Sequence, residues 1–280
     1  MEGADALVVA LLHGNLTGRP LALPGGMPTT SPPGRQPAVP FREDGWTTVP
    51  VADGSEMRLF VARPESPGPH PGLLVLQEAF GVNAHIRDIT TRFAGQGFVA
   101  IAPELFHRTG TGVEGSYDDF PGMQPHFSAI TTEGLAADLH AAHAWLVADD
   151  DVDAERTAAI GYCMGGRAAF LANAELPLAA SVSYYGGGIA QQLLGRVGDL
   201  HAPQLMFWGG LDTHIPPEQH RAIDDALRAA GKPYTTVEFG EGDHGFFCDA
   251  RASYNADVAA EAWALTIAFF ARTTGLRPTG

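Results

Sequence analysis

Short apolar runs alternate along this chain with segments of helical periodicity, and this alternation limits the folds open to it. The runs Gly72–Gln77 and Phe98–Ala102 have the length and composition of strands buried on both faces. Between them, residues 83–96 carry apolar side chains at helical spacing and end in glycine. Buried strands that alternate with helices indicate a mainly parallel sheet joined by right-handed crossovers. The sequence therefore predicts an α/β fold.

The same alternation continues to the C-terminus. We expect further strands at Thr157–Tyr162, Ala179–Tyr185, Gln204–Trp208 and Tyr234–Phe239, and further helices at Thr131–Ala148, Met164–Ala174, Pro217–Ala230 and Ala256–Ala271. Ahead of them, Trp46–Val51 and Met57–Ala62 predict a hairpin that can supply antiparallel edge strands. Residues 104–123 have the composition of a loop. Such a sheet carries helices on both faces and binds ligands at the carboxyl ends of its strands.

Residues 1–42 differ in composition from the rest. Ten glycines and prolines fall between positions 20 and 40, a density that excludes a helix or a central strand. We interpret 1–42 as an extension with a flexible or polyproline-like linker, and 43–280 as one domain. The apolar stretch near the start has Glu2 and Asp5 as its only early charges and no basic flank, so we expect a cytoplasmic protein.

Charge and cysteine content narrow the possible partners. The chain has 32 acidic and 17 basic residues and a formal charge of -15, the wrong sign for nucleic acid or an anionic membrane. Two cysteines do not form a disulfide framework. His140 and His143 share a helix, but no set of further ligands accompanies them, and Asp149 to Asp151 fit a solvated turn. We expect no metal and no cofactor; the oligomeric state is not predicted.

The turn at residues 161–165 has the sequence pattern of a catalytic nucleophile. Gly161-Tyr-Cys-Met-Gly165 lies between an apolar strand and a helix, the context in which a Gly-x-nucleophile-x-Gly elbow forms. Small residues two before and two after the nucleophile prevent collisions between the strand and the helix. The nucleophile would be Cys163, and a helix N-terminus favours its thiolate. The alternative is a small buried cysteine in a glycine-rich turn.

An elbow nucleophile needs an acid and then a histidine, in that chain order. Asp212 follows one expected strand, and His244 follows the next. We therefore predict that Cys163, Asp212 and His244 form a triad in which histidine moves the proton and aspartate fixes its tautomer. His214 gives the wrong order for a base, and Asp243, next to His244 in sequence, is expected to be solvated.

Several motifs together resemble the dienelactone hydrolase (carboxymethylenebutenolidase) family over about residues 45–272. They are Leu76-Gln-Glu-Ala-Phe-Gly-Val-Asn-Ala-His-Ile-Arg-Asp88, Ala102-Pro-Glu-Leu-Phe-His-Arg108, Gly161-Tyr-Cys-Met-Gly-Gly166, Ser183-Tyr-Tyr-Gly186 and Gly242-Asp-His-Gly-Phe246. The resemblance implies an α/β-hydrolase fold and a Cys-His-Asp triad. It also implies that Glu78 contacts the resting thiol, an arrangement compatible with an ion pair between Glu78 and Arg108. Backbone N–H groups of Ala79 and Met164 would form the oxyanion hole.

The resemblance further implies substrate-binding roles for Arg108 and Tyr185. A second family arginine normally lies four residues after the catalytic histidine, where this chain has Cys248. Arg251 is three residues further on and is the candidate replacement. Since one position has lost its arginine, we expect only a modest preference for substrates that carry a carboxylate.

These patterns predict a hydrolase of small esters or lactones that acts through Cys163. The named activity that the resemblance implies is carboxymethylenebutenolidase. One alternative is a promiscuous carboxylesterase with another natural substrate. An alternative of a different class is a non-catalytic protein of the same fold in which Cys163 is a redox-responsive thiol. The intact acid and histidine argue against a sensor, which needs neither.

Overall fold

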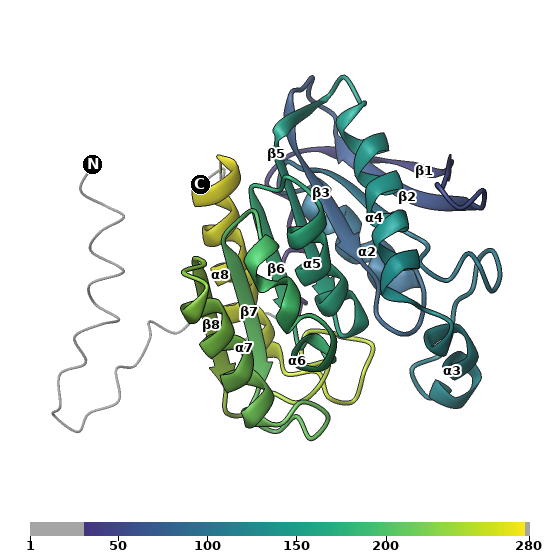
Figure 1. The fold of residues 1–280 in the computed structure, drawn as a ribbon. Coiled ribbons are helices and arrows are strands. Elements are labelled where there is room, and N and C mark those ends of the chain that lie inside the picture. The colour runs from purple at the N-terminus through teal and green to yellow at the C-terminus, as the bar shows by residue number, and fades with distance from the viewer. Residues whose placement is uncertain (1–30, 278–280) are drawn as a thin grey trace, which may run out of the picture. The chain divides into compact units, whose positions relative to one another are not determined.

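The computed structural model describes residues 31–277, which contain a single eight-stranded sheet (Figure 1). Its strand order is β1-β2-β4-β3-β5-β6-β7-β8. The strands are β1 (Phe41–Pro50), β2 (Glu56–Pro64), β3 (His70–Leu76), β4 (Val99–Pro103), β5 (Val152–Tyr162), β6 (Ala180–Tyr184), β7 (Gln204–Gly209) and β8 (Tyr234–Phe239). Strands β4, β3 and β5 to β8 pair in parallel, and β1 and β2 are antiparallel at one edge. The predicted α/β class and the leading hairpin are confirmed.

Helices cover both faces of this sheet, as expected. In Figure 1, α4, α5 and α7 lie in front of the strands, and α2 and α8 lie behind them. The helices are α2 (Ala84–Ala94), α3 (Phe120–Ser128), α4 (Thr132–Val147), α5 (Met164–Glu175), α6 (Ile189–Gln192), α7 (Pro217–Ala229) and α8 (Ala256–Thr274), with a 3₁₀ turn at Leu194–Asp199. The loop expected over 104–123 ends earlier, because α3 begins at Phe120 inside that range; the sequence did not predict this helix.

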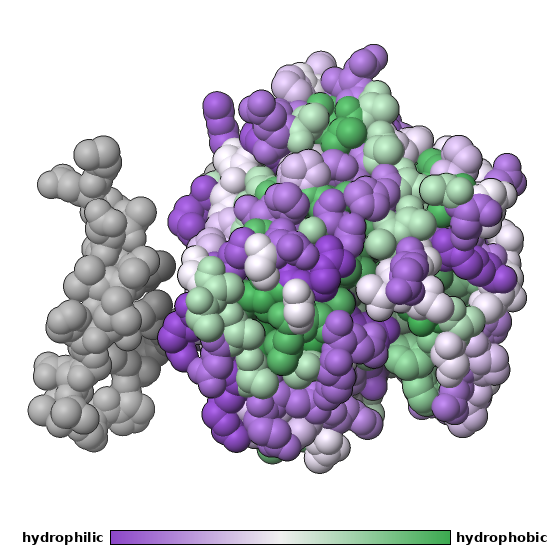
Figure 2. Space-filling model, in the orientation of Figure 1, coloured by the Kyte–Doolittle hydropathy of each residue, from purple (hydrophilic) through white to green (hydrophobic). Residues whose placement is uncertain are grey.

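Burial explains why the central strands have no polar face. Every residue of β4, β6 and β7 is buried, and so is all of β3 after its first residue. The outer strand β8 is exposed or half-buried along its length, and only its last residue, Phe239, is buried. On the face drawn in Figure 2, polar side chains form most of the outer surface, and apolar ones gather in the recesses. Among residues 31–277, no helix is long and apolar enough to cross a membrane.

The folded part begins earlier than the boundary at residue 43. Strand β1 starts at Phe41, and residues 32–40 already contact the core. Backbone N–H groups of Ala38 and Val39 donate to the Gly95 carbonyl over 2.7 and 3.0 Å. Gly34, at φ 79°, lies so close to the Trp263 ring that a Cβ would be 2.4 Å from it. Residues 1–30 of the expected linker lie outside the described residues.

Candidate active site

Cys163 occupies a sharp turn between β5 and α5. Its backbone has φ 56° and ψ -115°, a region that residues with a side chain seldom occupy. Such strain persists only where the surroundings hold it, and it concentrates at functional sites. Here the Cys163 N–H donates to the Tyr184 carbonyl over 3.0 Å, and the Gly166 N–H donates to the Cys163 carbonyl over 2.9 Å. The half-buried thiol therefore stands at the N-terminus of α5.

The flanking glycines are required by close backbone contacts. A Cβ on Gly161 would lie 1.8 Å from the carbonyl oxygen of Gly165, and a Cβ on Gly165 would lie 2.1 Å from the carbonyl oxygen of Leu76. Both obstacles are backbone atoms, which cannot rotate away as a side chain could. The spacing of the elbow in the sequence thus has the steric cause that we expected of it.

Asp212 and His244 meet beyond the ends of β7 and β8. Nδ1 of His244 is 2.7 Å from Oδ2 of Asp212. The other carboxylate oxygen of Asp212 accepts the backbone N–H groups of His214 and Ile215 at 2.7 and 3.2 Å. Burial opposes ionisation of Asp212, but the hydrogen bond and positive charge of His244 hold the pKa of Asp212 below its usual value.

The pKa of His244 depends on the neighbouring Cys163. Burial by itself would lower the pKa of His244. Attraction to a Cys163 thiolate, together with hydrogen bonds to Asp212 and Cys163, instead raises the pKa of His244 to about 10. His244 therefore interacts with both Asp212 and Cys163, and its raised pKa favours the protonated imidazole at neutral pH.

The two competing residues take other positions. His214 is exposed, and its ring lies edge-on to that of His244 with centroids 5.2 Å apart. Asp243 is also exposed, and it accepts the backbone N–H of His244 rather than an N–H of the ring. Neither occupies the place of the base or of its orienting acid.

A pocket of about 420 Å³ opens beside His244. Its wall includes Tyr117, His214 and Arg251. The Arg251 guanidinium lies 5.7 Å from the centroid of the Tyr117 ring and 6.0 Å from that of Phe80, positions that suit cation–π attraction. A cation thus faces the space in which a small substrate could contact His244.

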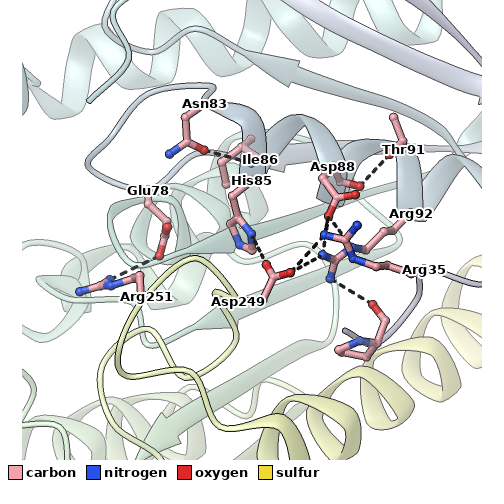
Figure 3. Close-up of polar contacts among 11 residues, drawn as sticks. Arg35, Glu78, Asn83, His85, Ile86, Asp88, Thr91, Arg92, Asp249 and Arg251 are labelled. Atoms are coloured by element: carbon pink, nitrogen blue, oxygen red, sulfur yellow. Dashed lines mark hydrogen bonds and ion pairs between the residues drawn. The ribbon is translucent and has the colours of Figure 1, made fainter. Parts of the chain in front are cut away.

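Glu78 lies behind this arginine, just after β3. Its carboxylate is fully buried, and neither oxygen accepts a hydrogen bond from a residue in the range 31–277. The only ion pair that Glu78 forms within that range joins its Oε1 to Nη1 of Arg251 at 3.6 Å (Figure 3). The contact with the Cys163 thiol that the resemblance implies is therefore not made as a hydrogen bond in this structure. The ion pair considered between Glu78 and Arg108 is replaced by the pair with Arg251.

Arg108 lies away from the pocket that contains His244. Its guanidinium donates to both carboxylate oxygens of buried Asp138 at 2.8 Å, and to Asp53 at 2.7 Å. It lines a separate small pocket together with Phe106 and Leu135. These acidic partners come from distant parts of the chain, so the pairing could not be inferred from local sequence. The substrate-binding role of Arg108 stays a prediction, and its engagement with Asp138 and Asp53 does not favour it.

The remaining predicted residues lie around the nucleophile. Tyr185 is fully buried, its ring centroid lies 5.2 Å from that of His244, and its hydroxyl has no partner among the described residues. Met164 is the first residue of α5, so its N–H lacks an intrahelical acceptor. Ala79 follows Glu78 beyond β3. Their roles as oxyanion donors stay a prediction.

Sequence reasoning missed a buried group near this site. Ligand-type atoms of Glu78, His85 and Cys248 lie within 4.8 Å of one another. Burial, and then the negative charge of Glu78, raise the pKa of the Cys248 thiol to about 12. Glu78 and His85 belong to one motif, but Cys248 is far from both in sequence, so spacing could not have revealed the group.

His140 and His143, considered as ligands from sequence, have separate partners. His140 is more than half exposed and lies 3.2 Å from Glu175. His143 is buried and its Nε2 is 3.1 Å from the Thr157 hydroxyl. The two side chains therefore do not converge on a shared site.

Comparisons with known proteins identify the family of this chain. Residues 57–274 match the model of the dienelactone hydrolase family. A putative carboxymethylenebutenolidase of Synechocystis is 36% identical over 73% of this chain and 87% of its own. One from Yersinia pestis is 36% identical over 81% and 87%. The crystal structure of a putative dienelactone hydrolase from Klebsiella pneumoniae superposes with a TM-score of 0.76 at 34% identity, covering 83% of this chain and 99% of that one.

Proposed function

The chain belongs to the dienelactone hydrolase family, and on that premise we propose that it hydrolyses small lactones or esters through Cys163, His244 and Asp212. The observation that carries the proposal is the 2.7 Å contact between His244 and Asp212 beside the strained Cys163 elbow. A thiolate held next to an imidazolium is a nucleophile with its acid already in place.

In the proposed acylation step, Sγ of Cys163 bonds to the substrate carbonyl carbon, and the carbonyl π electrons move to oxygen. Backbone N–H groups of Met164 and Ala79 stabilise that oxyanion. Collapse restores the carbonyl and breaks the carbon–oxygen ester bond, and the leaving oxygen takes its proton from His244. Water, deprotonated by His244, then cleaves the thioester and releases the acid with the free thiolate. Asp212 orients the imidazole throughout.

We further propose that Glu78 and Arg251 adapt the site to its substrate. A carboxylate on the substrate can bind Arg251 and so weaken its pairing with Glu78, whose 3.6 Å separation is longer than a hydrogen bond. Substrate binding would thereby allow Glu78 to move, so that His244 can take the proton of the Cys163 thiol, as the resemblance implies. The preferred substrates are therefore small lactones or esters that carry a carboxylate.

The test is a hydrolysis screen of lactones and aryl esters with the wild type and Cys163→Ala. We expect turnover in the wild type and a loss of about 10³-fold or more in the variant. Iodoacetamide should inactivate the wild type and label Cys163, since Cys248 is buried with a raised pKa.

Pre-steady-state kinetics with an activated ester separate the hydrolase from a thiol sensor. A hydrolase releases a burst of product and then turns over, whereas a sensor releases at most one equivalent. Full activity after stoichiometric labelling of Cys163 would refute the proposal. Turnover of aryl esters with none of any lactone would favour a carboxylesterase.

A further inference from the structure

Three buried side chains beside the site bring potential metal-ligand atoms close to one another. They are Glu78, His85 and Cys248, each at least nine-tenths buried. Both carboxylate oxygens of Glu78 and Nε2 of His85 lack a hydrogen-bond partner among residues 31–277. A buried polar atom without a partner costs about 1–3 kcal/mol, and more if it is charged, so three such atoms together require an explanation.

The imidazole of His85 is held in an orientation suited to coordination. Nδ1 of His85 is 3.0 Å from Oδ1 of Asp249. Asp249 is fixed in turn by Arg35 at 3.1 Å and by Arg92 at 3.4 Å (Figure 3). A carboxylate that accepts the Nδ1 proton leaves the lone pair on Nε2, which is the usual second-shell arrangement of a metal-binding histidine.

We propose that Glu78, His85 and Cys248 form a binding site for a zinc-type divalent cation. One carboxylate oxygen, one imidazole nitrogen and one thiolate are a donor set that zinc accepts, with a fourth position left for water. Bonds to such an ion are about 2.0–2.3 Å long, which puts tetrahedral ligand atoms about 3.3–3.8 Å apart. Ligand atoms that now lie up to 4.8 Å apart would therefore have to close in by up to about 1.5 Å, through side-chain rotation. On binding, the Cys248 thiol releases its proton to solvent and its sulfur bonds to the ion.

The guanidinium of Arg251 is the positive charge that would repel a cation bound to Glu78. It pairs with Glu78 at 3.6 Å, and its side chain is 22% exposed on the pocket side. Arg251 can therefore turn towards the pocket when an ion takes over the carboxylate. Replacing Arg251 by a neutral residue should therefore strengthen metal binding, whereas replacing a ligand should weaken it. The two opposite effects test the proposal independently.

A bound metal ion would also inhibit the hydrolase, because it would hold Glu78 in place when substrate binding should move it. This consequence alone rests on the proposed function. Binding itself is measured in Cys163→Ala, which lacks the proposed nucleophile and retains Cys248 as its one thiol. The untagged full chain is titrated with Co²⁺, whose thiolate charge-transfer absorption reports Cys248, and Zn²⁺ is then added as competitor. Circular dichroism monitors folding of every variant.

We expect one equivalent of Co²⁺ to give this absorption and Zn²⁺ to remove it. Adding Asp249→Asn should weaken binding about 10- to 100-fold, as the loss of a second-shell partner usually does, and His85→Gln should weaken it at least as much. Arg251→Gln should tighten it, and the control His143→Gln should leave it unchanged. Anomalous scattering from zinc-soaked wild-type crystals locates the ion without any variant. No thiolate absorption at millimolar Co²⁺, or an absorption unchanged in folded His85→Gln, would overturn the proposal.

Discussion

Arg251 offers the sharpest test of how this site selects its substrate. The replacement Arg251→Gln removes the cation that lines the pocket and keeps a side chain of similar length. A hydrogen bond to a charged group contributes about 1.5–3 kcal/mol, which corresponds to about 10- to 100-fold in kcat/KM. Since the Arg251 side chain is 22% exposed and already shares its charge with Glu78, solvent screening places the expected effect near 10-fold.

The measured quantity is a ratio of two substrates. For one lactone acid and its methyl ester, kcat/KM is determined in the wild type, Arg251→Gln and Arg108→Gln. Loss of Arg251 leaves Glu78 buried without its cation, and this can lower activity towards both substrates. The ratio cancels such shared damage and retains only the contribution of substrate charge.

Arg108→Gln is the matched control, because Arg108 is paired with Asp138 and Asp53 outside the pocket. We expect the ratio of acid to ester to fall about 10-fold in Arg251→Gln and to stay within about twofold of the wild type in Arg108→Gln. An unchanged ratio in Arg251→Gln, or an equal fall in Arg108→Gln, would refute our assignment of the carboxylate contact.

Three further predictions concern the catalytic residues. His244→Ala should lower kcat by about 10²–10⁴-fold, whereas exposed His214→Ala should have little effect; equal losses would mean that the base is misassigned. NMR titration should give His244 a pKa of about 10, so that its ring is cationic below that pH. The variant Cys163→Ala removes the sulfur whose negative charge raises this pKa and should therefore lower it. An unchanged titration in the variant would contradict the interaction between the two side chains. Gly161→Ala places a Cβ 1.8 Å from backbone and should abolish activity, while Gly240→Ala meets nothing within 4 Å and should preserve it.

The sheet and the elbow could be predicted because local sequence determines them. Buried strands such as β3 need continuous apolar residues, and the elbow needs glycine at 161 and 165 for steric reasons that act within a few residues. Helix α3 could not be predicted in this way, since Phe120–Ser128 contains two prolines and a glycine. One proline lies in its first turn, where its missing N–H is harmless, and Asp119 caps the helix by accepting the Gly122 N–H at 3.0 Å.

Side-chain partners from distant segments were the part that sequence could not supply. Arg108 matched a family position, but its pairing with Asp138 depends on how α4 packs beside the loop after β4. The reach of Arg251 depends on consecutive turns after His244, which bring the chain back over the pocket. The number of residues between His244 and an arginine does not show whether that arginine reaches the pocket. Turns in the chain change its direction while the spacing in sequence stays the same.

The exchange of an arginine for Cys248 therefore has two consequences in the folded protein. A fully buried position next to Glu78 now holds a neutral thiol, and the cation that balances this carboxylate comes from Arg251, at the edge of the pocket. Removing the partner of a buried charge is costly, so the ion pair with Arg251 contributes to holding Glu78 at this buried position. A substrate carboxylate or a metal ion would each alter that pairing. In both proposals the cysteine at position 248 thus leaves the balance of the Glu78 charge to Arg251, which substrate charge or a metal ion would change.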